Sequence, residues 1–117
     1  MPDGKSNNGI YLAYFTAEFG TTLGIFLLKD GVLCGGDLGN GMYDGKLTLA
    51  DGGKRLTGSV EFRTTHGGTM ITGASSDLPV SYATDVDLSL PLDGVDFHSI
   101  SSVSGPVNVR FEKIRSI

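Results

Sequence analysis

Residues 80–90 read Val80-Ser81-Tyr82-Ala83-Thr84-Asp85-Val86-Asp87-Leu88-Ser89-Leu90. Mostly apolar side chains alternate along this stretch with small or acidic ones, so the pattern repeats every two residues. Successive side chains of a β-strand point to opposite faces, and a period of two therefore predicts a strand. One face of this strand is expected to contact a core, and the other is expected to face water.

The same alternation recurs along the chain between turns rich in glycine, of which Lys29-Asp30-Gly31 is typical. No stretch of about 11 or more residues keeps the spacing of an amphipathic helix without a glycine or proline. Strands are predicted at residues 9–17, 21–29, 32–37, 41–50, 54–64, 69–73, 79–91 and 95–103, with 107–115 as a ninth candidate.

Successive antiparallel strands with short turns form either a closed meander or a sandwich. Closure removes the unpaired strand edges that promote aggregation, and eight strands of about ten residues suit a small barrel. We therefore predict an all-β fold, an eight-stranded antiparallel up-and-down barrel, with a β-sandwich as the alternative. Residues 1–8 are predicted to be a flexible N-terminal tail, and residues 9–117 a single barrel domain.

Composition limits the partners of this 117-residue chain. Nine Lys and Arg residues stand against 13 Asp and Glu residues, a formal net charge of −4. The basic stripe typical of nucleic-acid binding is missing, so direct DNA or RNA binding is not expected. The N-terminus lacks a signal-peptide pattern, and the longest apolar run, residues 23–28, is far shorter than the ~20 residues of a membrane helix. These features predict a cytoplasmic protein that does not bind membranes.

The first two predicted strands break the alternation, because residues 9–15 and 23–28 are apolar on both faces. A barrel needs apolar side chains on its inner face only, so something else must cover the outer face. A packed helix or tail, or scattered surface residues, would account for the pattern. A homodimer or partner interface is the interpretation that we favour. The residues predicted for that interface are Ile10, Leu12, Tyr14, Phe26 and Leu28.

The sequence offers little chemistry for an enzyme. His66 and His98 stand in no recognisable nucleophile context, and Asp85 and Asp87 share a strand face without a third ligand nearby. The single cysteine, Cys34, cannot form an internal disulfide, and its apolar neighbours predict an inert thiol in the core. We expect no catalytic residues, no cofactor and no metal.

A longer run of residues in the first half of the chain resembles a known family. The run comprises Gly9-Ile10-Tyr11, Phe15, Gly24, Leu27-Leu28-Lys29-Asp30-Gly31, Gly35-Gly36-Asp37, Tyr43, Gly45 and Leu47. Its order and spacing resemble the GrlR-like family of small negative regulators of bacterial type III secretion genes. The resemblance implies a lipocalin-like barrel that forms a homodimer and represses by sequestering a transcriptional activator. An acidic loop of the family corresponds here to residues 48–54, with one acid and one base.

The opening Gly9-Ile10-Tyr11 is also similar to the Gly-x-Trp opening of lipocalins. This similarity implies that Tyr11, Ala13 and Phe15 face inward and that Ile10, Leu12 and Tyr14 face outward. The alternating face of residues 80–90 would complete the lumen, where either plain core packing or an apolar ligand is compatible with the sequence. The residues predicted for the lumen are Tyr11, Phe15, Val80, Tyr82, Val86 and Leu88.

Overall fold

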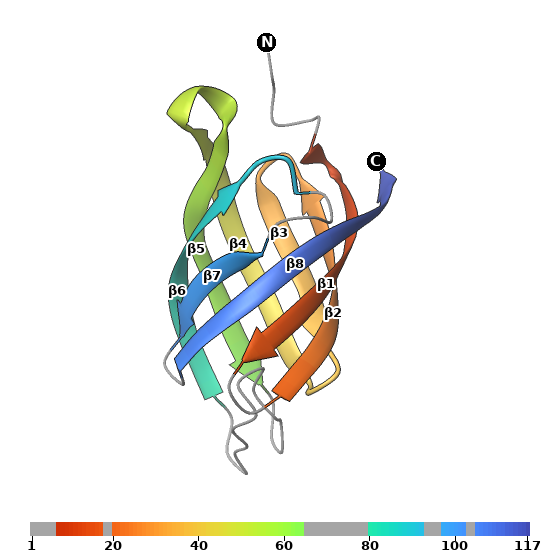
Figure 1. Cartoon of the computed structure of the whole chain (residues 1–117), viewed down its shortest axis with the longest axis vertical. Coiled ribbons are helices and arrows are strands. Elements are labelled where there is room, and N and C mark those ends of the chain that lie inside the picture. The colour runs from red at the N-terminus through yellow and green to blue at the C-terminus, as the bar shows by residue number, and fades with distance from the viewer. Residues whose placement is uncertain (1–6, 18–19, 65–79, 93–96, 103–104) are drawn as a thin grey trace.

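The computed structural model describes residues 7–17, 20–64, 80–92, 97–102 and 105–117. These residues form eight strands and one short 3₁₀ turn, η2 (Asp51–Gly53) (Figure 1). The strands are β1 (Gly9–Ala17), β2 (Gly20–Lys29), β3 (Val32–Asp37), β4 (Gly41–Ala50), β5 (Arg55–Thr64), β6 (Val80–Ser89), β7 (His98–Ser102) and β8 (Gly105–Ser116).

All eight strands belong to one antiparallel sheet with the order β6-β5-β4-β3-β2-β1-β8-β7. Strands that follow one another along the chain are neighbours in the sheet, except for β6 and β7, which are its two end strands. β1 also pairs with β8 and so brings the two ends of the chain together. The sheet curls into a nearly closed barrel (Figure 1). The prediction of an up-and-down barrel is confirmed. The alternative, a β-sandwich, is wrong, because the strands form one sheet.

Most predicted strand boundaries agree with the structure within one or two residues. The ninth candidate, 107–115, is the long strand β8, and the segment predicted at 95–103 contains β7, with residues 95, 96 and 103 outside the described part of the chain. The segment predicted at 69–73 lies outside the described residues. The eight strands of the described residues therefore include β8, the ninth candidate.

The core lies inside the barrel and is built from the inward face of every strand. Period-two burial is clearest in β1 and β2, where buried residues alternate with half-buried or exposed ones. Aromatic rings fill the middle: Tyr43 stacks on Phe15 at 5.9 Å between ring centroids and meets Phe26 and Phe62 edge-on at 5.0 Å each. Offset and edge-on ring pairs of this kind add to the stabilisation from area burial alone.

The fold begins two residues earlier than predicted. Asn7 and Asn8, assigned from the sequence to a flexible tail, are instead buried. The Tyr11 hydroxyl donates to the Asn7 carbonyl at 2.6 Å, and Asn8 exchanges two hydrogen bonds with Asp30 in the β2–β3 turn. Asp30 and Gly31 have φ of 51° and 85°, the positive values that a two-residue hairpin turn requires. Residues 1–6 lie outside the described part of the chain.

Candidate functional site

A patch of large apolar side chains covers the outside of β1 and β2. It consists of three directly paired residues from each strand, which we call the outer apolar face: Ile10, Leu12, Tyr14, Leu23, Ile25 and Leu27. The three from β1 are half-buried, whereas those from β2 are exposed, with Ile25 the most open at 57%. Directly paired residues share one side of a sheet, so the six form a single surface.

The neighbouring strand β3 leaves this face uncovered because it presents small residues to it. Gly36 stands opposite Ile25, and Cys34 stands opposite Leu27. Gly36 has no side chain to shield Ile25 from water. Cys34 itself is half-buried on the outside of the barrel, so the prediction of a core thiol is wrong: the strand period places the inward Leu33 in the core instead.

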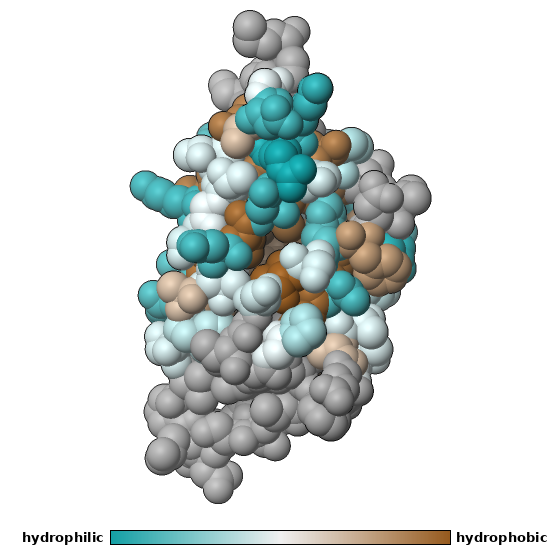
Figure 2. All heavy atoms as spheres, turned by 60° about the vertical axis from the view of Figure 1, so that its left-hand side comes forward, coloured by the Kyte–Doolittle hydropathy of each residue, from teal (hydrophilic) through white to brown (hydrophobic). Residues whose placement is uncertain are grey.

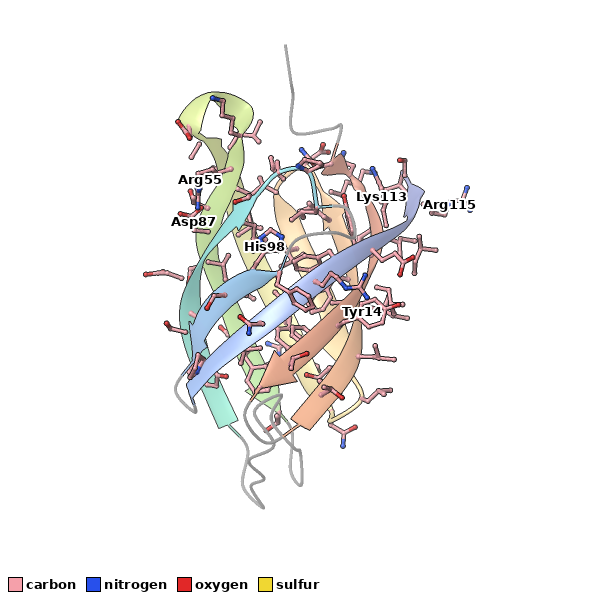
Figure 3. All side chains as sticks on the ribbon, viewed as in Figure 1. Tyr14, Arg55, Asp87, His98, Lys113 and Arg115 are labelled. Atoms are coloured by element: carbon pink, nitrogen blue, oxygen red, sulfur yellow. The ribbon has the colours of Figure 1, made fainter. Side chains whose placement is uncertain are left out.

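On the β8 side, two charged residues hold Tyr14 in place at the edge of the outer apolar face. The Tyr14 hydroxyl donates a 3.0 Å hydrogen bond to a Glu112 carboxylate oxygen, and the Arg110 guanidinium lies 4.3 Å from the ring centroid (Figure 3). The hydrogen bond to Glu112 raises the pKa of Tyr14. A cation above the face of an aromatic ring is attracted by the ring quadrupole, so β8 holds both the ring and the hydroxyl of Tyr14.

Two residues predicted for the interface are in a different place. Phe26 and Leu28 are buried inside the barrel, at 3% and 2% exposure, and cannot line an outer surface. The reason is register: Phe26 pairs with the inward Tyr11, and Leu28 pairs with the inward Gly9. Leu23, Ile25 and Leu27 take the outward positions. The pairing of β1 with β2 is the signal that would have found them, because paired residues point to the same side.

The residues predicted for the lumen lie on inward faces wherever the structure describes their side chains. Tyr11, Phe15, Val86 and Leu88 are buried, and Tyr82 is half-buried against the core. The side chain of Val80 lies outside the described part. Inside the barrel, Tyr82 packs on Phe62 at 5.2 Å between ring centroids.

These inward faces enclose a cavity of about 70 Å³. Its walls are almost entirely apolar, and among the described lining residues only Tyr43, Tyr82 and Thr84 have hydroxyls. Pockets for drug-sized ligands measure ~300–1,000 Å³, so this cavity is several times smaller. Most of the lumen is therefore packed core, and the remaining space has room for a narrow group only.

The Gly-Gly-Asp run has a structural explanation in the β3–β4 turn. One carboxylate oxygen of Asp37 accepts hydrogen bonds from the amides of Gly39 (2.8 Å) and Gly41 (2.9 Å), and the other accepts one from the Tyr43 hydroxyl at 2.6 Å. Burial, and then the hydrogen bond to Asp37, raise the pKa of Tyr43 above its usual value. An Asp that accepts from amides two and four residues ahead is a turn motif, and this role was missed in the sequence.

The described residues form no cluster of three His, Cys, Asp or Glu side chains that could hold a metal ion. His98 is buried beside Phe111, at 5.8 Å between ring centroids, and His66 lies outside the described residues (Figure 3). Asp87 forms a 2.6 Å ion pair with Arg55 on the outside of the barrel (Figure 3). Within the same residues, no helix is long and apolar enough to span a membrane.

Comparisons with known proteins add no family to this picture. No family model matches the chain, and neither curated proteins nor solved structures contain a significant match to it. The class that the fold itself defines is a small, all-β, eight-stranded, nearly closed up-and-down barrel.

Proposed function

We propose that this protein is a non-enzymatic regulator that acts by protein–protein contact and forms a homodimer through the outer apolar face. The observation that carries the proposal is the exposure of Leu23, Ile25 and Leu27 in one continuous row on β2. Contiguous apolar surface of this kind marks interaction sites in soluble proteins, because leaving it in water costs free energy.

The charges beside the outer apolar face favour a second copy of the chain as the occupant. Arg110, Glu112 and Arg115 border it on β8, and beyond β3 the charged outward residues of β4 include Asp44 and Lys46. Each border thus has charges of both signs. A two-fold interface brings the same surface together with itself, and borders of mixed charge can do so without facing like charges.

At the level of the biological process, we propose sequestration of a transcriptional regulator, as in the GrlR-like family. The support is the run from Gly9 to Leu47, whose Gly24, Gly35, Asp37 and Tyr43 all have defined places in the barrel. The loop that corresponds to the family's acidic loop contains Asp51 and Lys54 and is not acidic. Contact with a regulator would therefore use a different surface of this protein.

A matched pair of variants tests the homodimer. Leu27 on the outer apolar face and Leu49 near the end of β4 are almost equally exposed, at 36% and 37%. Leu27→Glu should convert a dimer to a monomer, because a charge buried at an interface without a partner is costly. Leu49→Glu should leave the dimer intact. Multi-angle light scattering measures the mass, and circular dichroism verifies that both variants keep their strand content.

Cys34 provides a second readout in the unmodified protein. As the single cysteine, half-buried and opposite Leu27, it borders the outer apolar face. Alkylation by iodoacetamide should be slow in the wild-type dimer and at least several-fold faster in Leu27→Glu. A wild-type protein that is monomeric at tens of micromolar, with equal alkylation rates in both proteins, contradicts the homodimer.

Capture experiments address the regulatory partner separately. The wild-type protein and Leu12→Glu, a variant in the centre of the outer apolar face, would be used as baits in extracts of the native host. Recovery of a DNA-binding transcriptional regulator by the wild-type protein supports sequestration. Repeated recovery of no such regulator contradicts it, whatever the oligomeric state.

A further inference from the structure

The two end strands of the sheet, β6 and β7, meet along a seam. They lie against each other, but the hydrogen-bonded order of the described strands begins with β6 and ends with β7, so no ladder joins them. Elsewhere around the barrel, antiparallel ladders link each strand to the next. Among the described strands, this is the one junction of the wall without a backbone ladder, which makes it the place where the wall opens most easily.

The internal cavity is lined by residues of all eight strands and extends to this seam. Four consecutive inward residues of β6 line it, Tyr82, Thr84, Val86 and Leu88, and Ile100 of β7 lines it from the other side. Tyr82, Thr84 and Ile100 are only half-buried, whereas Phe15 and Phe26 on the far wall are buried. Figure 2, which brings the β6 and β7 side forward, shows apolar surface between hydrophilic side chains there. The cavity therefore approaches the surface sideways, through the seam.

The end of the barrel at which β1 begins offers no comparable route. Asn7 and Asn8 are buried there, and their hydrogen bonds link β1 at Tyr11 and the β2–β3 turn at Asp30. The Lys113 ammonium lies 5.9 Å from the Tyr11 ring centroid at the same end (Figure 3). A ligand that reached the cavity from this end would have to break these contacts.

The size and lining of the cavity restrict the class of ligand. A cavity of 150 Å³ lined by apolar side chains takes benzene, and about 70 Å³ is half of that volume. A ring is therefore too wide, whereas the end of an unbranched aliphatic chain is narrow enough. The rest of the alkyl chain would lie in the seam, which can widen because, among the described strands, β7 is hydrogen-bonded only to β8.

The outside of the seam restricts the head group. Outward residues of β6 and β7 include Asp85, Asp87, Ser99 and Ser101, which are acids and hydroxyls. The Arg55 guanidinium in this region is already paired with Asp87 at 2.6 Å. A carboxylate at the seam would face the negative charge of Asp85, because that of Asp87 is offset by Arg55. A hydroxyl would instead meet groups with which it can hydrogen-bond.

We propose that the β6–β7 seam admits a single-chain aliphatic alcohol, whose alkyl end occupies the cavity between Tyr82 and Ile100. This inference does not depend on the homodimer, because the seam and the outer apolar face are formed by different strands. The probes are 1-octanol, octanoate, which has the same chain with a charged head, and cyclohexylmethanol, which has a ring.

Isothermal titration calorimetry would give the affinities, and amide NMR shifts would give the location. The wild-type protein should bind 1-octanol saturably, octanoate at least tenfold more weakly, and cyclohexylmethanol not measurably. The amide shifts should be largest in β6 and β7. No saturable 1-octanol binding, equal octanoate binding, ring binding as tight as that of 1-octanol, or shifts confined to β1 and β2 would each overturn the proposal.

Two tryptophan variants on the same strand provide the structural control. Ile100→Trp fills the seam with a larger inward side chain and should lower the 1-octanol affinity at least tenfold. Ser99→Trp adds the same side chain on the outward face and should leave the affinity unchanged. If Ile100→Trp does not fold, Val86→Phe narrows the cavity from β6 and should have the same effect. Unchanged affinity in the folded inward variant overturns the proposal.

Discussion

At the scale of single residues, Asp37 and Tyr43 show how a buried polar contact is tolerated in an apolar barrel. Tyr43 packs among Phe15, Phe26 and Phe62, and its hydroxyl reaches the Asp37 carboxylate at 2.6 Å. A buried hydroxyl without a partner is costly, so Asp37 satisfies Tyr43 and the β3–β4 turn together. The same contact makes the stability of the barrel depend on pH.

Tyr43→Phe should lower the free energy of unfolding by about 1.5–3 kcal/mol at pH 8, because a hydrogen bond to a charged acceptor is lost. The pKa of Tyr43 is raised in the folded protein, so this stabilisation is complete below the unfolded pKa of ~10 and falls as the pH rises above it. The difference between wild type and variant should therefore narrow above pH 10, by at most ~1.4 kcal/mol per pH unit.

Urea unfolding at pH 8 and pH 11 measures both differences. The other ionisable groups are present in both the wild type and Tyr43→Phe, so their contributions cancel in the difference between the two free energies of unfolding. A difference that stays constant or grows between these two pH values would contradict the assignment of the raised pKa to the buried hydroxyl of Tyr43.

Gly35 and Gly36 are adjacent glycines with different roles. A Cβ on Gly35 would collide with the Ile25 carbonyl oxygen and come within 2.9 Å of the Phe26 Cα, whereas a Cβ on Gly36 has only the Gly41 carbonyl oxygen nearby, at 3.2 Å. Gly35→Ala should destabilise the protein by about 1–3 kcal/mol, the usual cost of overpacking. Gly36→Ala should change stability far less, because the alanine points outward beside Ile25. Thermal unfolding of both variants measures this contrast, and equal losses would contradict it.

At the scale of elements, position in the sheet separates β1 from β7. β1 pairs along its length with both β2 and β8, whereas the five residues of β7 pair with β8 only. Local opening is easiest where few backbone hydrogen bonds hold a strand. The outer apolar face thus lies on two strands that are each paired on both sides, whereas the seam is bordered by a short strand that is paired on one side.

Hydrogen exchange should reflect this difference in pairing. The amides of His98–Ser102 in β7 are expected to exchange at least tenfold faster than those of Tyr11–Phe15 in β1. Exchange measured by NMR at neutral pH gives the rates, and β6, the other end strand, serves as the comparison. Protection of β7 equal to that of β1 would mean that the seam is closed by bonds that the sheet order does not contain.

At the scale of the whole molecule, the barrel separates two surfaces of different chemistry. The outer apolar face lies on β1 and β2, and the seam lies between β6 and β7, with β8 between them on the shorter path (Figure 1). Substitutions at distant sites without shared partners act independently. Monomeric Leu27→Glu should therefore bind 1-octanol with the wild-type affinity, and Ile100→Trp should keep the wild-type mass in light scattering. Weaker 1-octanol binding by Leu27→Glu, or a lower mass for Ile100→Trp, would show that the two surfaces are coupled.

The fold class followed from the sequence because strand alternation and turn residues are local properties. Residues 80–90 show the period of two, and Asp30-Gly31 shows the turn, without any knowledge of distant contacts. The inward positions of Tyr11 and Phe15 also agree with the structure, because alternation along one strand is enough to separate its faces once one residue is placed.

Only the tertiary structure decided which side of β2 faces outward, where the sheet fails to close, and what Asp37 does. Residues 23–28 are apolar at nearly every position, so their own pattern does not distinguish Phe26 from Ile25. The pairing of Phe26 with Tyr11 makes that choice, because paired side chains must share one side of the sheet. The seam likewise depends on the two end strands of the sheet meeting around a cylinder, and a closure of that kind has no signature within any single segment.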